Sequence, residues 1–175
     1  SSNEDSSSYE EIRYEGIGNN GIALIIEVLT DNRNRTASEI RSTLSKNGGN
    51  LGELGSVAYN FERIGEIIFN TINIDFNDFF EFSVNIGAID IVEEKSNIIV
   101  TTEPESFGAI RDQLEKKFEE PITSKLIWKT KNSITLDINN AKSILKIIDL
   151  LEDNDDVQNV YTNAIIPEDL ELNDK

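Results

Sequence analysis

Histidine, cysteine and methionine are all absent from this chain of 175 residues. Without cysteine and histidine there are no disulfides, thiolate nucleophiles or imidazole bases, and nearly all zinc and iron chemistry is excluded. No apolar run approaches the roughly eighteen residues of a membrane span, so no membrane partner is predicted. We therefore expect a protein that is not an enzyme, that uses no cofactor and that holds no metal.

Basic side chains are also scarce, with 16 Lys and Arg against 33 Asp and Glu and a formal net charge of -17. Such a surface repels nucleic acid over most of its area, because phosphate contacts require Lys and Arg. One segment differs from the rest of the chain. Residues 29–47 contain only two acidic side chains, Asp31 and Glu39, and four basic ones. The basic residues are Arg33, Arg35, Arg41 and Lys46.

Hydrophobic periodicity predicts alternating strands and helices. The predicted strands are 13–18, 21–29, 57–63, 66–70, 89–93, 97–101, 122–129 and 157–162. Thr36-Ala37-Ser38-Glu39 is interpreted as a capping box, which would start a helix that ends at Asn47-Gly48-Gly49. Further helices are predicted from Asp75, from Pro104 and across 141–151. Ile64-Gly65 is interpreted as a tight turn between two strands.

The order of these elements predicts an α+β protein made of two small α/β sandwich domains. Residues 11–70 plus 138–166 would form a split ferredoxin-like domain, with two helices packed on an antiparallel sheet. Residues 71–137 would form a second α/β domain inserted into the first. Residues 1–10 are predicted to be a flexible linker and residues 167–175 a C-terminal tail.

Two motifs invite a ligand interpretation that their context does not support. Gly16 to Gly21 satisfies G-x-G-x-x-G, but a strand follows it where a dinucleotide site needs a helix, so a hairpin turn is predicted. A calcium loop that begins at Asp153 would need Gly where the chain has Gln158 and Glu where it has Ala164.

The acidic run itself is still unusual, because carboxylates at a helix C-terminus oppose the helix dipole. We therefore predict that Asp153, Asp155 and Asp156 contact a protein partner.

The basic segment allows two interpretations. Its arginines could pair with Asp31 and Glu39, or they could form a surface that contacts phosphates, to which Arg side chains are well suited. On the second interpretation the candidate contacts to nucleic acid or the ribosome are Arg33, Asn34, Arg35, Thr36, Arg41, Lys46, Gly48, Gly49 and Asn50. RNA fits better than duplex DNA, because no helix presents the long basic face used in the major groove.

Three separated motifs resemble one known family. They are YEEIRYEGIGNNGIALIIEVLTDNRNRT (9–36), the GGNLG and GSV pair (48–57) and LLEDNDDVQNVYTN (150–163). In this order they resemble the YebC/PmpR family, which includes mitochondrial translational activators of cytochrome c oxidase. Asn47 and Ile89 depart from the usual pattern, where many members have His and an acidic residue.

The resemblance implies the same split two-domain arrangement and a preceding basic helical domain. We expect this chain to be a form that lacks that domain. The implied function is non-enzymatic regulation of gene expression, most directly as a translation factor that contacts the ribosome or RNA. The alternative is a transcriptional regulator that binds DNA through the basic domain. A third alternative, an enzyme with carboxylate-bound Mg²⁺, would have to work without His or Cys. The location would be the cytoplasm of a bacterium or the mitochondrial matrix of a eukaryote.

Overall fold

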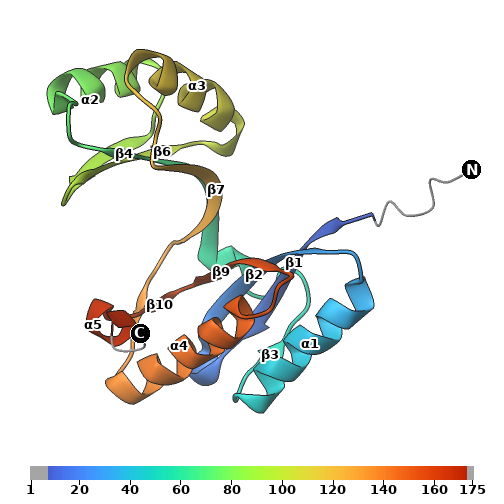
Figure 1. Cartoon of the computed structure of the whole chain (residues 1–175). Coiled ribbons are helices and arrows are strands. Elements are labelled where there is room, and N and C mark those ends of the chain that lie inside the picture. Colours follow the sequence, from blue (N-terminus) through green and yellow to red (C-terminus); the bar gives the residue numbers. More distant parts are fainter. Residues whose placement is uncertain (1–7, 173–175) are drawn as a thin grey trace, which may run out of the picture. The chain divides into compact units, whose positions relative to one another are not determined.

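The computed structural model describes residues 8–172, which divide into two compact units (Figure 1). Within these residues, unit 1 consists of 8–62 and 130–172, and unit 2 is 63–129. The limits of unit 2 differ at both ends from those of the predicted insertion, 71–137. The reason is that strands β4 (Phe61–Asn70) and β7 (Thr123–Thr130) both belong to the sheet of unit 2.

The two ends of the chain also differ from the prediction where they are described. Most of the predicted linker, residues 1–7, lies outside the described residues, and β1 already begins at Glu10. The predicted tail contains a short helix, α5 (Glu168–Leu172), and residues 173–175 lie outside the described part.

Unit 1 is a four-stranded antiparallel sheet with two helices on one face (Figure 1). The strand order is β3-β1-β2-β9. The elements are β1 (Glu10–Ile17), β2 (Ala23–Thr30), α1 (Arg33–Lys46), β3 (Asn50–Leu51), α4 (Ile138–Glu152) and β9 (Val157–Thr162). A short parallel pair is formed by β8 (Ile134–Thr135) and β10 (Ala164–Ile165).

Strand β2 is the centre of this unit because both of its faces are buried. One face packs against the helices, and the other carries Ile25, which is also fully buried. The helix-side core consists of Ile22, Leu24, Ile26, Val28, Ile40, Leu44, Ile144, Ile147, Leu151 and Ala164. A strand buried on both faces is expected to show a continuous apolar run rather than an alternating pattern, as IALIIEVL does.

The predicted α+β class, with two helices on an antiparallel sheet, is confirmed. The predicted strands 57–63 and 66–70 do not belong to this sheet, because residues 61–70 form the single strand β4 of unit 2. Strand β1 is a central strand of unit 1. The predicted pair of strands around Ile64-Gly65 is wrong, because β4 runs through this position without a turn. A Cβ at Gly65 would overlap Thr102 Oγ1 and would lie 2.6 Å from Phe107 Cδ2. Glycine is needed here for close packing.

Unit 2 is a second four-stranded sheet, of order β5-β6-β4-β7, covered by two helices. Its further elements are α2 (Phe76–Asn85), β5 (Asp90–Glu94), β6 (Asn97–Thr102) and α3 (Phe107–Lys117). Asp75 caps α2 as predicted, and a 3-10 turn at Pro104–Ser106 leads into α3. Phe69 and Phe79 meet edge to face at 5.1 Å in the core. Among residues 8–172, no helix is long and apolar enough to cross a membrane.

Replacing Gly65 by alanine should destabilise unit 2 by about 1–3 kcal/mol, because the added methyl group displaces Phe107 and Thr102. The matched control is Gly108→Ala in α3, where the nearest atom to a Cβ is 3.9 Å away. That change should be neutral or should stabilise by about 0.4–1 kcal/mol. Urea unfolding followed by the fluorescence of Trp128, the single tryptophan, measures both. Equal stabilities of the two variants would contradict the packing role of Gly65.

Candidate functional site

Helix α1 begins one turn earlier than predicted, and the predicted capping box is wrong. The N-cap is Asn32, whose Oδ1 accepts a hydrogen bond of 3.0 Å from Arg35 N. Asn is as good a cap as Thr, so the local sequence alone does not decide between them. Thr36 lies within α1 and is completely buried. Glu39 accepts a hydrogen bond of 2.7 Å from Asn154 Nδ2 and does not bond the N-cap residue.

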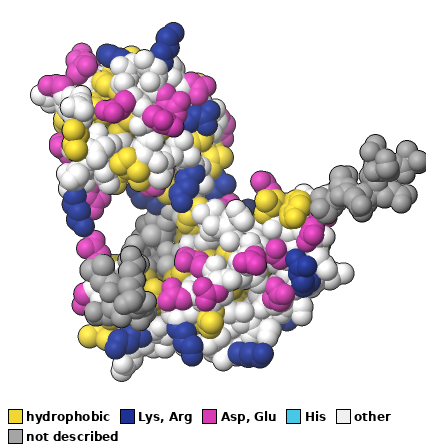
Figure 2. Space-filling view, viewed as in Figure 1, with side chains coloured by type: hydrophobic (Ala, Val, Ile, Leu, Met, Phe, Trp, Pro, Cys, Tyr) yellow, Lys and Arg dark blue, Asp and Glu magenta, His cyan; other side chains and the backbone are white. Residues whose placement is uncertain are grey.

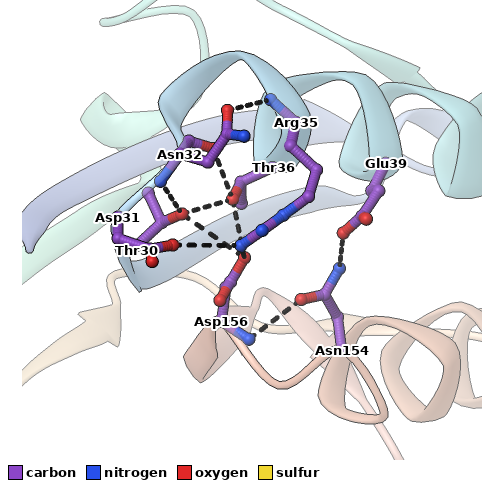
Figure 3. A network of polar contacts seen from close by, with 8 residues as sticks. All are labelled: Thr30, Asp31, Asn32, Arg35, Thr36, Glu39, Asn154 and Asp156. Atoms are coloured by element: carbon purple, nitrogen blue, oxygen red, sulfur yellow. Dashed lines mark hydrogen bonds and ion pairs between the residues drawn. The ribbon is translucent and has the colours of Figure 1, made fainter. Parts of the chain in front are cut away.

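The carboxylate of Asp156 collects the polar groups at the start of α1 (Figure 3). Its Oδ2 lies 2.7 Å from Thr36 Oγ1, 3.1 Å from Arg35 Nη2 and 3.4 Å from Thr30 Oγ1. Thr36 Oγ1 is also 2.7 Å from Thr30 Oγ1. A hydroxyl has one proton and a carboxylate can only accept. Thr36 therefore donates to Asp156, and the Thr30 hydroxyl supplies the proton between the two threonines.

The backbone around Asp156 is held in the same way. Asp156 N donates to Asn154 Oδ1 at 2.9 Å, and Leu29 N donates to Asp156 O at 2.8 Å. The turn between α4 and β9 is thus tied to the end of β2 and to the first turn of α1. Asp156 therefore has a structural role, whereas Asp153 and Asp155 are exposed. Partner contact through these two residues stays a prediction.

The electrostatics at this end of α1 are dominated by acid. The Thr36 hydroxyl, and then Arg35, hold the pKa of Asp156 below its ordinary value of 3.8 in spite of partial burial. Arg35 also pairs with Asp31 at 3.3 Å. A shallow pocket of about 350 Å³ opens beside this network. Its lining has one basic side chain and several acidic ones. It is lined by Arg35, Glu39, Asp153, Asn154, Asp155 and Asp156.

The basic side chains of α1 do not form one cluster. At about 100° per residue, Lys46 lies about 20° around the helix from Glu39, and Arg41 about 160° from it. Arg35 and Glu39 contact the turn between α4 and β9, so we call this flank the α4 side. Arg33 bonds Glu10 of β1 at 3.1 Å on the opposite flank, the β1 side, where Arg41 also lies. Within residues 8–172, Arg41 and Lys46 are exposed and form no ion pair.

The predicted contacts Gly48, Gly49 and Asn50 lie at the far end of α1, where the two glycines have a clear packing role. Gly48 has a φ of +82°, and a Cβ there would overlap the Asn19 side chain. A Cβ on Gly49 would lie 2.5 Å from Ile17 O. The turn after α1 is therefore packed backbone against backbone on the turn between β1 and β2. About 20 Å of helix separates it from Arg33.

A second carboxylate, that of Glu15, is almost fully buried and organises a loop. Its side chain accepts hydrogen bonds from the backbone N–H groups of Gly55 (2.6 Å), Val57 (3.1 Å) and Ala58 (2.6 Å). Burial raises the pKa of Glu15, but the three N–H groups and nearby Arg13 outweigh burial, so the pKa lies below its ordinary value. The carboxylate thus fixes the shape of the GELGSVA segment.

Comparison with known proteins agrees with these features. A family model described as "TACO1/YebC second and third domain" matches residues 9–164. The chain belongs to the TACO1/YebC family. A relative from Syntrophus aciditrophicus, named "Probable transcriptional regulatory protein", is 47% identical over 163 residues, which cover 93% of this chain and 65% of the relative. The crystal structure of a conserved hypothetical protein from Aquifex aeolicus matches with a TM-score of 0.80 and 36% identity, covering 91% of this chain and 66% of that one.

The motifs of this TACO1/YebC chain meet in pairs. TDNRNRT (30–36) and LEDNDDVQ (151–158) are joined through Asp156, and YEG (14–16) is joined to GSV (55–57) through Glu15. Sequence reasoning assigned no role to Glu15, Thr30 or Asn154. The sequence does contain a signal for Glu15, an acidic residue before glycine in a strand whose side chains must pack in the core. A carboxylate buried there needs several hydrogen-bond donors.

Replacing Asp156 by Asn should destabilise unit 1 by about 1–3 kcal/mol at neutral pH, because Thr36 loses its charged acceptor. The folded pKa of Asp156 is depressed, so its contribution is fully present above the ordinary value of 3.8 and is lost as pH falls through the folded pKa. The difference between wild type and variant should therefore shrink in acid. Urea unfolding followed by tyrosine circular dichroism reports on unit 1, which contains all four tyrosines. Exposed Asp155→Asn is the control, and a gap that does not change with pH would contradict this role.

Replacing Glu15 by Gln should loosen the loop at residues 52–58, because an amide NH₂ then faces backbone donors. We expect a loss of about 1–3 kcal/mol in stability, with faster hydrogen exchange at Gly55, Val57 and Ala58. Glu11→Gln, an exposed change on the same strand, should alter neither quantity. Unchanged exchange rates in the Glu15 variant would show that the carboxylate does not hold the loop.

Proposed function

We propose that this chain is a binding protein that regulates gene expression at translation, by contact of α1 with ribosomal or messenger RNA. One observation carries the proposal. In a chain of formal net charge -17, α1 has four basic side chains and one acidic one. Arg33 and Arg41 lie on the flank from which Glu39 is turned away. Exposed arginines suit the oxygens of phosphodiesters.

The charge of the remaining surface limits the kind of nucleic acid that fits. Acidic side chains are spread over the visible face of each unit, with basic ones among them (Figure 2). An extended duplex would meet these carboxylates, whereas a single strand or a loop of structured RNA can contact one helix flank. This favours RNA. The predicted contacts Lys46, Gly48, Gly49 and Asn50 lie at the other end of α1 and stay predictions.

Transcriptional regulation is the second candidate, because the relative from Syntrophus aciditrophicus is named for it. This chain spans about two thirds of that relative's length, 65%, so the relative also contains a segment outside the match. DNA binding by the whole protein would then rest on that segment, with the present units as a regulatory or assembly part. On this candidate the Arg33 and Arg41 flank has no role in DNA affinity.

Ribosome co-sedimentation at two salt concentrations separates the candidates. Wild type should sediment with ribosomes at low salt, and Arg33→Glu/Arg41→Glu should not, because two cations become anions on the contact flank. Arg35 is left unchanged because it pairs with Asp156. The matched control is Lys142→Glu/Lys146→Glu on α4, which makes the same change in net charge at exposed positions of the same unit. If neither wild type nor control sediments, the translational proposal is wrong.

A further inference from the structure

Tyr14 has a hydroxyl group whose environment the fold does not explain. The ring packs against the helix-side core of unit 1, and Oη is shielded from solvent without a hydrogen-bond partner among residues 8–172. A buried hydroxyl that makes no hydrogen bond lowers stability, and phenylalanine would fill the same space without this loss. A buried polar group without a partner requires an explanation, and a ligand that accepts its hydrogen bond would provide one.

The position of Tyr14 follows from the way β1 and α1 run alongside each other. Glu10, near the start of β1, bonds Arg33 at the start of α1. At the other end, a Cβ on Gly16 would lie 2.9 Å from Leu44 Cδ1, near the end of α1. Tyr14 lies on the same face of β1 as Glu10 and Gly16, since it is four residues from the first and two from the second. It is therefore at the level of the middle of α1, where Arg41 lies on the β1 side.

The charges around the Tyr14 hydroxyl come from the two elements already named. Burial raises the pKa of Tyr14; the positive charge of Arg33 opposes this, the negative charge of Glu10 adds to it, and that of Arg41 opposes it. A tyrosine with a pKa at or above the ordinary value of 10.0 is protonated at neutral pH, so the hydroxyl can donate a hydrogen bond. Arg33 and Glu10 are both largely exposed, with side-chain exposures of 65% and 52%. Such an exposed pair contributes little to stability, so another anion can replace Glu10 beside Arg33.

We propose that Tyr14, Arg33 and Arg41 form a seat for one backbone phosphate of the bound RNA. The inference rests on the proposed function and names the part of α1 that performs it. The two guanidinium groups turn outward to hold the phosphate oxygens. The Tyr14 hydroxyl, which is shielded from solvent in the free chain, then becomes accessible and donates to one of these oxygens. Glu10 is the competing anion that occupies Arg33 when no ligand is bound. Arg35 and Lys46, on the α4 side, take no part.

Binding of a short fluorescent single-stranded RNA to the whole chain, measured by anisotropy at several salt concentrations, tests the seat. Tyr14→Phe should weaken binding about three- to tenfold while leaving unfolding stability unchanged or raised, since it removes an unpaired hydroxyl. Arg41→Gln should weaken binding and reduce the salt slope by about 0.7, the value for one lost phosphate contact on a single strand. Glu10→Gln should strengthen binding. Lys142→Gln, which removes an exposed cation on α4, is the control.

The outcomes separate this inference from the proposed function. If wild type binds RNA and ribosomes, but Tyr14→Phe is silent and Lys46→Gln or Arg35→Gln weakens binding as much as Arg41→Gln, the seat is wrong and the proposed function stands. If wild type binds neither RNA nor ribosomes, both are wrong. Loss of affinity in Tyr14→Phe with equal or greater stability supports the seat, because a purely structural tyrosine would show the reverse.

Discussion

The hydrogen bond between Thr36 and Asp156 is the contact on which the arrangement of unit 1 depends. It joins the first turn of α1 to the turn that connects α4 with β9, across 120 positions of sequence. Around it, Leu29 N bonds Asp156 O and Glu39 bonds Asn154, so both helices are held at one end of the sheet. Since these contacts set the rotation of α1, they also decide which of its side chains face solvent on the β1 side.

Two carboxylates have become part of the framework of a strongly acidic chain, each in a different way. Asp156 is satisfied by side chains, and Glu15 by backbone N–H groups of one loop. In both cases the donors keep the charged form stable, so the acid joins segments without being neutralised. Arg35 belongs to the same framework, because its guanidinium group pairs with both Asp31 and Asp156. The net charge of the chain therefore says little about the α1 flank that bears Arg33 and Arg41.

Much of the fold could be predicted from the sequence, because its elements have strong local signals. The strand at 157–162 and the helix capped by Asp75 agree with the structure. The predictions are wrong where a residue distant in sequence decides between two structures that the local sequence allows equally well. Asn32 and Thr36 are both good caps, and only Asp156, from another part of the chain, shows why Thr36 is buried. The prediction of a turn at Gly65 is wrong because the local sequence does not show that Phe107 packs against this glycine.

The candidate site was harder to predict, for a related reason. The four basic residues of 33–46 are close in sequence, but the helix distributes them over two flanks, and neither flank can be assigned without the elements that pack beside it. Arg33 and Arg41 become neighbours of Tyr14 only through the parallel course of β1 and α1. The first interpretation of the basic segment is confirmed for Arg35, which pairs with Asp31, whereas contact with phosphates stays a prediction.

The split of unit 1 has a consequence for how the protein is made. Strand β2 pairs with β1, which precedes it directly, and with β9, which is synthesised far later; Ala23 N and Asn163 Oδ1 bond across 140 positions. Unit 2 is continuous and can close its core during synthesis. Until β9 arrives, the nascent chain carries a long apolar strand with one unpaired edge, the kind of template that recruits foreign strands. Pairing of β9 with β2 covers this edge, and we expect it to lower the risk of aggregation.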